Sequence, residues 1–317
     1  MTIEELLNIK RILKFITHNR VFHADDVFAY SVLNTLFPNN TLTRTRDIDI
    51  INNADIVFDV GGVYDKDNNR FDHHQKDFIL TRGKNNVPYS SFGLIWEKFG
   101  LEYCKLFINE NNELNHTLYR KIDERLVQPI DAVDNGIKII ENKCPGLFPV
   151  EVSGIISSFN PTWNEEQNHD LKFIEASNYA KTILDNIIRG ILGKLLSVET
   201  VENRIRFAND RNLEYIYLDE FMPWQETVLS SAIANNLKYV IFKEEENNYR
   251  ITTIPVDFNN MFEPRKALPS NWAGKTPEEL NKIIGISDAI FCHKGLFIAG
   301  AKSKESIMKM VKLALAN

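Results

Sequence analysis

The sequence predicts an α/β fold in which a parallel sheet occupies the N-terminal part of the chain. Up to about residue 200, short apolar runs rich in β-branched residues alternate with segments of helical periodicity. Clusters of polar side chains follow directly after several of these runs. Beyond about residue 200 the pattern changes to short β-rich pieces separated by acidic or asparagine-rich turns, which places a domain boundary there.

The first elements have the order strand, helix, strand. Residues 11–17 (RILKFIT) form an apolar run that predicts a buried strand. Residues 26–37 have apolar side chains at helical spacing, and Pro38 ends that pattern. Residues 54–62 (ADIVFDVGG) predict a second strand that ends in a glycine pair, which allows the backbone to turn tightly.

Further helices are predicted over residues 90–100, 115–135 and 168–195, and the last of these has the most regular periodicity. The later pieces EYIYL, KYVIF and YRITTIPV predict short strands. We therefore expect a first domain over residues 1–200, which includes the long helix, and a smaller mixed α/β domain over residues 201–317.

Composition and charge limit the class of protein. The 317 residues are enough for two domains, each with a core of its own. No run approaches the roughly 18 apolar residues that a membrane span needs, so no membrane association is expected. The start of the chain lacks a secretory or transit pattern and the three cysteines lie far apart, which predicts a cytoplasmic or nuclear protein. A net charge of -6 disfavours non-specific coating of nucleic acid but allows a local basic groove.

Imidazole and carboxylate side chains follow the predicted strands of the first half. They belong to three stretches, HNRVFHADD after the first strand, DVGG at the end of the second, and FDHHQ. Because ligands collect beyond the carboxyl ends of the strands in an open parallel sheet, we expect these stretches to converge on one site. The side chains concerned are His18, His23, Asp25, Asp59, Asp72, His73 and His74.

A fourth cluster, DAVDNG, lies late in the predicted helix over residues 115–135. Its carboxylates, Asp131 and Asp134, are three positions apart and therefore lie on one helix face. Taken alone, this cluster is typical of a solvated helix face or of a helix end at Asn135 and Gly136.

Several carboxylates and imidazoles in one crevice require a cation, because each unpaired buried charge costs several kcal/mol or more. Asp and His ligands without thiolates suit manganese, magnesium or zinc, and manganese fits an oxygen-rich set with some nitrogen. About seven ligands exceed one mononuclear site and match two divalent cations that share a bridging carboxylate, an arrangement that activates water in phosphoryl transfer. Each stretch taken alone is also explained as a hydrogen-bonded polar loop.

The order of these motifs resembles that of the DHH phosphoesterase superfamily, and more closely that of the Myg family (melanocyte proliferating gene proteins) of metal-dependent hydrolases. The resemblance covers nearly the whole chain and includes RTRD, YSSFGLIWEKFG, NPTW, PWQE, RKALPSNWAG and FCHKGLFIAG. It implies a DHH-type N-terminal domain that holds two manganese-type ions, joined by the long helix to a DHH-associated-like domain that closes over the substrate.

The resemblance also implies a set of metal ligands. One ion would be bound by His18, His23 and Asp59. The other would be bound by Asp25, His73 and an aspartate of the fourth cluster, with Asp59 bridging both ions.

The resemblance also bears on the choice of the fourth ligand and on the roles of His74, Asp72 and His23. Asp134 is preferred over Asp131 as the fourth ligand, although the spacing alone does not decide between them. His74 would polarise a phosphoryl oxygen or protonate the leaving group, and Asp72 would orient a neighbouring imidazole. His23 stands where most members of the superfamily have aspartate, which lowers the negative charge of the site.

In the second domain, His293, Lys294 and the later Gly300 resemble the glycine-rich, histidine-containing motif of DHH-associated domains. Small residues there would let a phosphate or ribose approach the backbone, with the histidine and lysine as donors. A β-hairpin turn that needs small residues for packing explains the same pattern equally well.

Basic and aromatic residues elsewhere give weaker indications. Arg265 and Lys266, close in sequence to Trp272, would clamp a phosphate and stack a base, or would form a solvated turn. We interpret Trp163 and Trp224 as core or interdomain anchors rather than as base platforms.

Three functions are compatible with these patterns. The resemblance implies a metal-dependent phosphodiesterase, most concretely a 3′-to-5′ exonuclease that acts on RNA or short oligonucleotides. The same site would suit a hydrolase of a small phosphorylated metabolite, pyrophosphate or a cyclic dinucleotide, and the net negative charge favours short or small substrates over long duplexes. A non-catalytic protein that keeps the metal site for folding or binding is the third. The sequence leaves the formation of a homodimer open.

Overall fold

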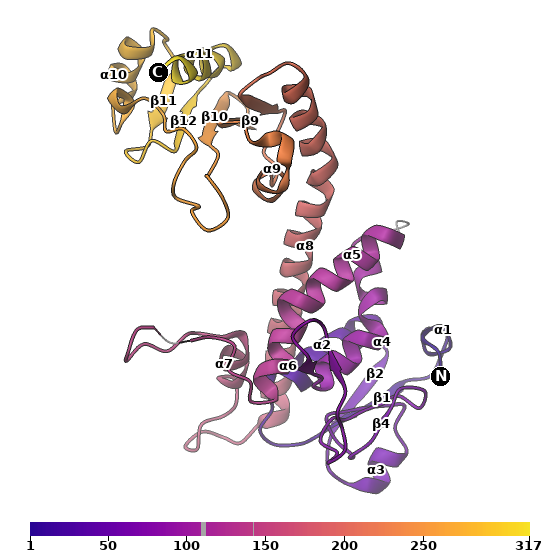
Figure 1. The fold of residues 1–317 in the computed structure, drawn as a ribbon. Helices are drawn as coiled ribbons and strands as arrows, with labels where there is room; N and C mark the ends of the chain where they lie inside the picture. Colours follow the sequence, from indigo (N-terminus) through magenta and orange to yellow (C-terminus); the bar gives the residue numbers. More distant parts are fainter. Residues whose placement is uncertain (109–111, 142) are drawn as a thin grey trace. The chain divides into compact units, whose positions relative to one another are not determined.

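The computed structural model describes residues 1–108, 112–141 and 143–317. These residues divide into two compact units, Met1–Leu192 (unit 1) and Gly193–Asn317 (unit 2). Each unit has its own five-stranded sheet with helices beside it (Figure 1), so the predicted α/β fold class is confirmed. The assignment of a catalytic role to residues 1–200 and of a substrate-binding role to residues 201–317 stays a prediction.

The sheet of unit 1 is mainly parallel. Its strands are β1 (Leu13–Thr17), β2 (Asn40–Arg44), β3 (Ile56–Phe58), β4 (Tyr64–Asp65) and β5 (Arg70–Phe71), and a separate hairpin consists of β6 (Thr81–Arg82) and β7 (Val87–Pro88). The strand order in the sheet is β2-β1-β3-β5-β4. All neighbours except the antiparallel pair β4 and β5 run parallel, so β1, β3 and β5 end at the same edge.

The helices of unit 1 cover this sheet and one another. They are α1 (Ile3–Leu7), α2 (Ala24–Leu36), α3 (Ile48–Asn52), α4 (Ser91–Lys105), α5 (Asn112–Ile122), the π-helical turn η1 (Asp123–Val127), α6 (Gln128–Asp134), α7 (Val152–Ser157) and α8 (His169–Asp210), which continues into unit 2. α2 is almost entirely buried and packs against α4, with the rings of Phe28 and Phe92 5.3 Å apart. The helix predicted over residues 115–135 is thus interrupted by a π-helical turn just before Pro129, which has no N–H to donate to the preceding turn.

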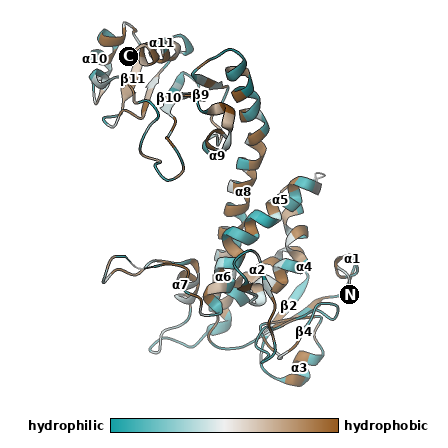
Figure 2. Ribbon diagram, viewed as in Figure 1, coloured by the Kyte–Doolittle hydropathy of each residue, from teal (hydrophilic) through white to brown (hydrophobic). Residues whose placement is uncertain are grey.

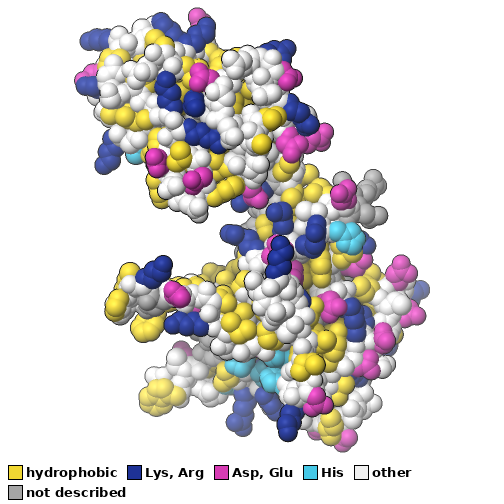
Figure 3. Space-filling view, in the orientation of Figure 1, with side chains coloured by type: hydrophobic (Ala, Val, Ile, Leu, Met, Phe, Trp, Pro, Cys, Tyr) yellow, Lys and Arg dark blue, Asp and Glu magenta, His cyan; other side chains and the backbone are white. Residues whose placement is uncertain are grey.

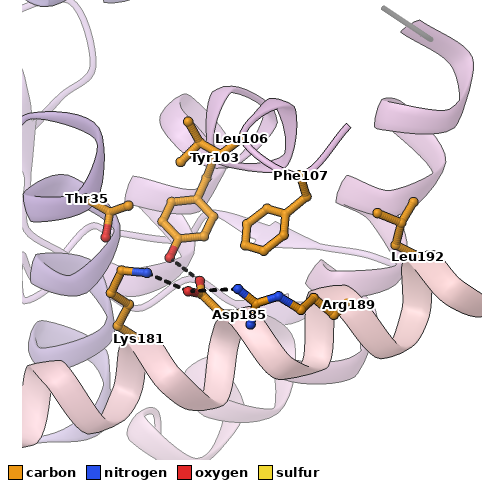
Figure 4. A pocket seen from close by; sticks show the side chains of 8 residues that line it. All are labelled: Thr35, Tyr103, Leu106, Phe107, Lys181, Asp185, Arg189 and Leu192. Carbon is orange, nitrogen blue, oxygen red and sulfur yellow. Dashed lines mark hydrogen bonds and ion pairs between the residues drawn. The ribbon is translucent and has the colours of Figure 1, made fainter. Parts of the chain in front are cut away.

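α8 is fastened to its neighbours in unit 1 by a polar network. A pocket of about 460 Å³ lies between α2, α4 and α8, and Figure 4 shows Asp185 at its centre. Asp185 accepts hydrogen bonds from the Tyr103 hydroxyl at 2.7 Å and from Lys181 Nζ at 2.5 Å, and Arg189 Nη2 lies 4.0 Å away. Because Tyr103, Lys181 and Arg189 already engage the Asp185 carboxylate, we interpret these residues as a structural contact between α4 and α8 rather than as a binding site.

Unit 2 contains a mixed sheet with a hydrophobic cluster on each face. Its elements are β8 (Tyr215–Leu218), α9 (Gln225–Ser230), η2 (Ala232–Ala234), β9 (Tyr239–Glu245), β10 (Asn248–Thr253), η3 (Ser270–Trp272), α10 (Pro277–Ile284), β11 (Ala289–Cys292), β12 (Ile298–Ala301) and α11 (Lys304–Ala316). The strand order is β11-β12-β10-β9-β8, and only β8 and β9 run parallel.

The side chains of β9 alternate between the two clusters of unit 2. Tyr239 and Ile241 belong to the cluster that contains residues of α10 and α11, whereas Val240 and Phe242 belong to the cluster that contains residues of α8 and α9. This alternation is the two-residue period of a strand that is buried on both faces. In Figure 2, hydrophobic and hydrophilic residues are interspersed along α8. None of the helices described combines the length and the apolar character needed to cross a membrane.

Candidate metal centre

Three strand ends bring the predicted polar stretches together in unit 1. β1 ends at Thr17 and is followed by His18, β3 is followed by Asp59, and β5 is followed by Asp72. The parallel pairing of these strands places the three stretches at one edge of the sheet. The remaining members of the cluster come from the start of α2 and the last residue of α6.

The ligand atoms of these side chains form three compact groups, and within each group all atoms lie within 4.8 Å of one another. The groups are His18, Asp26 and Asp59; Asp59, His73 and His74; and His23, Asp25 and Asp134. Asp59 belongs to two groups, which is the position that a bridging carboxylate needs. Half of the members are buried, namely His18, Asp25, Asp26 and Asp59, whereas His73 and Asp134 are partly buried. His23 and His74 are exposed, and Figure 3 shows histidine side chains at the surface of unit 1.

Asp59 is the centre of the cluster and has an unusual backbone. Its φ of 57° lies in the left-handed region, which few residues other than glycine, asparagine and aspartate adopt. Its Oδ2 lies 3.1 Å from His18 Nε2 and its Oδ1 lies 3.5 Å from His73 Nε2, while Ser91 Oγ donates a hydrogen bond to Oδ1 at 3.1 Å. Burial acts to raise the pKa of Asp59, but the neighbouring imidazoles of His18 and His73 outweigh it and lower that pKa far below its usual range. Asp59 is therefore an anion surrounded by imidazoles.

Buried atoms without hydrogen-bond partners show that this cluster fits cations. Both carboxylate oxygens of Asp25 and His73 Nε2 have no partner among the described residues. His73 Nε2 lies 3.8 Å from Asp25 Oδ2 and 3.3 Å from Asp134 Oδ2 but forms no hydrogen bond with either carboxylate. Burial and the nearby Asp59 and Asp134 raise the pKa of Asp25. Each such orphaned polar group costs about 1–3 kcal/mol, and a divalent cation between them would remove that cost.

Asp26 is a member of the cluster that the sequence interpretation did not include. Its Oδ2 lies 3.2 Å from His18 Nε2, and its Oδ1 accepts the His23 backbone N–H at 2.9 Å. The latter bond belongs to a capping box in which Asp26 occupies the third position of α2. Helix capping alone explains a carboxylate at this position. In the sequence, the tandem Asp25-Asp26 was the only indication of the additional contact of Asp26 with His18.

His23 is grouped differently from what the resemblance implies. The structure places it with Asp25 and Asp134, whereas the resemblance implies that it shares an ion with His18. The ring centroids of His18 and His23 are 6.0 Å apart. Their assignment to particular ions stays a prediction.

Asp72 holds the exposed His74 in a fixed orientation. Asp72 Oδ1 lies 2.7 Å from His74 Nδ1 and also accepts the His74 backbone N–H, and Oδ2 accepts the Gly62 N–H at 2.6 Å. The hydrogen bond to Asp72 raises the pKa of His74. Burial acts to raise the pKa of Asp72, but these hydrogen bonds lower it. An orienting role for Asp72 would need this contact, and the role itself stays a prediction.

Asp131, the alternative ligand, lies outside the cluster. Its Oδ2 is 2.6 Å from Arg82 Nη2, and its Oδ1 accepts hydrogen bonds from Ser90 Oγ at 2.5 Å and from the Gly93 N–H at 3.1 Å. Burial raises the pKa of Asp131 to about 7 against the opposing effect of Arg82. Of the two aspartates, Asp134 lies in the cluster and Asp131 does not, and the role of Asp134 as a ligand stays a prediction.

The predicted substrate-binding residues of unit 2 fall into two sets. His293 and Lys294 are exposed in the turn between β11 and β12, where His293 Nδ1 accepts the Gly295 N–H at 3.0 Å. Gly300 lies within β12, and a Cβ atom there would lie only 2.3 Å from Arg250 Nη1. Close packing against Arg250 and Phe291 therefore explains the glycine without a substrate, whereas the exposed His293 and Lys294 stay predicted substrate contacts.

The second set is engaged by unit 2 itself. Arg265 Nη1 donates hydrogen bonds to the backbone carbonyls of Ala234 at 2.6 Å and Leu237 at 3.3 Å. Lys266 Nζ donates to the carbonyl of Leu315 at 2.8 Å. These bonds favour a structural role for Arg265 and Lys266 over the predicted phosphate clamp.

The tryptophans correct two interpretations of the sequence. Trp272 is 2% exposed, so the prediction that it stacks a base beside Arg265 is wrong. Trp224 is buried in unit 2, as a core residue should be. Trp163, by contrast, is 93% exposed, so its interpretation as a core residue is wrong, while that as an interdomain anchor stays a prediction. Sequence gives the type of an aromatic residue but not the neighbours that would cover it.

Fold and site together define an α/β protein with a cluster of carboxylates and imidazoles, suited to divalent cations, at the carboxyl edge of a mainly parallel sheet. The chain belongs to the MYG1 family, because the family model MYG1_exonuc, described as "Uncharacterised protein family (UPF0160)", matches residues 14–315. The predicted membership of the Myg family is confirmed.

Relatives match the chain over nearly its whole length. It is 32% identical over 335 residues to a MYG1 protein of Saccharomyces cerevisiae, with 98% of each chain covered. It is 32% identical over 323 residues to a protein of Homo sapiens named MYG1 exonuclease, with 95% of this chain and 85% of the relative covered. It is also 30% identical over 313 residues to a MYG1 protein of Dictyostelium discoideum, with 94% and 95% covered.

Proposed function

We propose that the chain is a metal-dependent exonuclease that removes nucleotides from the 3′ end of RNA or short oligonucleotides. The observation that carries this proposal is the position of Asp59, an anion shared by two groups of potential ligands. Mammalian relatives that cover 95% of this chain are named MYG1 exonuclease, which supports the nuclease activity.

The donor set suits two divalent cations, for which manganese is the first choice and magnesium or zinc the alternatives. Asp59 would be the bridging ligand. The terminal ligands would be His18, His23, Asp25, His73 and Asp134, with Asp26 as an additional carboxylate beside His18. When bound, such a pair of cations lowers the pKa of water and neutralises charge on the attacking and leaving oxygens of a phosphodiester.

The chain itself would supply a proton through His74. Because His74 Nδ1 is engaged by Asp72, the opposite ring nitrogen Nε2 is directed away from that carboxylate. The raised pKa of His74 keeps the imidazole protonated over a wider pH range, as a general acid requires. His74 would donate this proton to a phosphoryl oxygen or to the leaving group, and Asp72 would stabilise the resulting orientation.

The first test is hydrolysis of single-stranded RNA in the presence of manganese. A 5′-labelled strand should shorten stepwise, and a 3′-labelled strand should release a labelled mononucleotide at once. The reverse labelling result would contradict the proposed polarity. Turnover of pyrophosphate or a cyclic dinucleotide without any shortening of RNA would favour the small-molecule hydrolase, and no turnover of any of these substrates would favour the non-catalytic protein.

The second test is the substitution Asp59→Asn. Asparagine also adopts the left-handed backbone, so the strand end should keep its conformation while the bridging charge is lost. We expect kcat to fall on the order of 100-fold or more, with an unchanged circular dichroism spectrum as the control for folding. Hydrolysis at the normal rate by this variant would overturn the assignment of Asp59 as the bridge.

A further inference from the structure

An exposed tryptophan lies in a loop of unit 1, between α7 and α8 (Figure 1). Trp163 is 93% exposed, whereas Trp96, Trp224 and Trp272 are each at most 4% exposed. Large aromatic side chains are normally at least partly covered, because leaving an indole in water forgoes the gain from its burial. Trp163 is therefore a candidate for contact with a ligand.

The loop is tied to the segment that carries two of the proposed metal ligands. Asn160 Nδ2 donates to the carbonyl of Phe22 at 2.9 Å, and Asn160 Oδ1 accepts the Phe22 N–H at 3.0 Å. Phe22 is buried and directly precedes His23. Since three residues span at most about 11 Å, the Cα atom of Trp163 lies within that distance of Asn160.

Internal hydrogen bonds give this loop a defined shape. The Thr162 N–H donates to Glu165 Oε2 at 2.7 Å, and Thr162 Oγ1 donates to Asn164 Oδ1 at 2.8 Å. Gln167 Nε2 donates to the Thr162 carbonyl at 2.9 Å. The indole is thus presented on a preorganised support, which lowers the entropy cost of binding.

Two exposed arginines lie in or on the segment to which Asn160 is tied. Arg20 belongs to the segment between β1 and α2, and Arg46 Nη1 donates to the carbonyl of Asn19 at 3.2 Å and to Asn19 Oδ1 at 3.0 Å. In Figure 3, Lys or Arg side chains lie next to histidines on this face of unit 1. An aromatic surface together with cationic side chains is the combination by which proteins hold single-stranded nucleic acids.

We propose that Trp163 stacks on a base of a single-stranded substrate whose phosphodiester lies at the metal centre, with Arg20 and Arg46 facing the phosphate backbone. This inference rests on the proposed nuclease function and specifies its substrate class. In a duplex the base faces are covered by neighbouring bases, so an indole gains a stacking partner only from a single strand. The enzyme is therefore selective for single strands through Trp163.

Iodide in solution quenches the fluorescence of exposed indoles. Because the other tryptophans are buried, quenching by iodide reports on the exposure of Trp163. The full-length protein with manganese is titrated with a hydrolysis-resistant phosphorothioate oligonucleotide, and binding is followed independently by anisotropy of a labelled strand. We expect the single strand to change the tryptophan fluorescence and to protect it from iodide, and a duplex of the same sequence to do neither. Full accessibility to iodide at saturating single strand would overturn the proposal.

Variants test the same contact in turnover. Trp163→Ala should raise KM for single-stranded RNA about 5- to 150-fold, with a smaller change in kcat, and Trp163→Phe should recover part of the loss. Phe148→Ala is the matched control, since Phe148 is an exposed aromatic residue of unit 1 in another loop (86% exposed). Its KM should be that of the wild type, and hydrolysis of bis-p-nitrophenyl phosphate should be unchanged in all three variants.

The outcomes separate this inference from the proposed function. If the wild type shortens RNA but Trp163→Ala leaves KM unchanged, stacking is wrong and the nuclease function stands. If the wild type neither binds nor hydrolyses RNA, both are overturned. If the indole becomes protected as the protein concentration rises without oligonucleotide, the surface is a contact between copies of the chain, and stacking is again wrong.

Discussion

The orientation of the Asp59 carboxylate depends on Ser91, a residue that is not among the proposed ligands. The Ser91 hydroxyl donates a hydrogen bond to Asp59 Oδ1, and the neighbouring Ser90 hydroxyl donates to Asp131 Oδ1. Both serines are completely buried at the start of α4. The tandem Ser90-Ser91 therefore connects the proposed bridging carboxylate to a buried ion pair behind the cluster.

This connection predicts the effect of Ser91→Ala. Removing the hydroxyl takes away the hydrogen bond that orients Asp59, and groups of this kind typically contribute 10- to 100-fold to metal affinity. We expect the dissociation constant for manganese, measured by isothermal titration calorimetry, to rise by about this factor. Ser158→Ala is the control, because the Ser158 hydroxyl donates to the Ile155 carbonyl at the end of α7 and should leave the affinity unchanged. An unaltered affinity in Ser91→Ala would contradict the orienting role.

Residue types and their order were sufficient to indicate most of the candidate cluster, because strand ends in a parallel sheet converge whatever the rest of the fold. They were insufficient wherever a residue distant in sequence determines which contact a side chain makes. The i, i+3 spacing of Asp131 and Asp134 leaves both on one helix face, and the contacts of Asp131 with Arg82, Ser90 and Gly93 separate them. In the same way, capping by Asp26 concealed its contact with His18.

At the scale of elements, a buried ion pair joins the β6–β7 hairpin to the helices behind the metal centre. Arg82 of β6 contacts Asp131 of α6 and also donates to Asp123 Oδ1 in η1 at 3.1 Å. The packing leaves no spare room, because a Cβ atom at Gly93 would lie 2.1 Å from Asp131 Oδ2. The contacts of Arg82 in the hairpin therefore help to fix the position of α6 and of Asp134 at its end.

The buried pair predicts a large loss of stability for Arg82→Leu. The substitution leaves Asp131 buried without its counter-charge, which should lower the free energy of unfolding by about 3–5 kcal/mol. Urea denaturation followed by circular dichroism measures the change. The double variant Arg82→Leu/Asp131→Leu removes both charges and should recover much of the loss. Equal stability of the single variant and the wild type would show that the pair does not hold α6.

Helices and strands could be predicted from the sequence where the spacing of apolar residues was regular and a helix-ending residue followed. α2 and α4 were anticipated from helical spacing, and Pro38 marks the end of the first. The long helix was expected to end near residue 195 but continues to Asp210, because Val201, Ile205 and Ala208 maintain the apolar spacing against the core of unit 2. The edge strand β2 was missed, since its sequence NTLTR is largely polar.

For the whole molecule, the division into two units predicts that metal acts on only one of them. All residues of the proposed cluster belong to unit 1, and unit 2 has hydrophobic clusters of its own. A ligand that binds only the folded state stabilises it by about 2.7 kcal/mol at 100 times its dissociation constant. Manganese should therefore slow hydrogen exchange in unit 1 and not in the sheet of unit 2.

Hydrogen–deuterium exchange followed by mass spectrometry on the full chain measures this difference. With manganese at 100 times its dissociation constant, the slowest amides of β1, β3 and α2 should exchange about 100-fold more slowly than with a chelator. Amides of β9 to β12 serve as the internal control. Equal slowing in both sheets, or none in unit 1, would contradict a metal site confined to the first unit.

The hydrogen bonds between Phe22 and Asn160 connect positions 138 residues apart. A ribosome makes the N-terminal part of a chain first, so the histidines of the candidate metal centre emerge long before Asn160, to which their loop is hydrogen-bonded. Closing so distant a contact is slow compared with forming local helices. We therefore expect the loop that carries His18 and His23 to reach its final position in the nascent protein only after Asn160 has been synthesised.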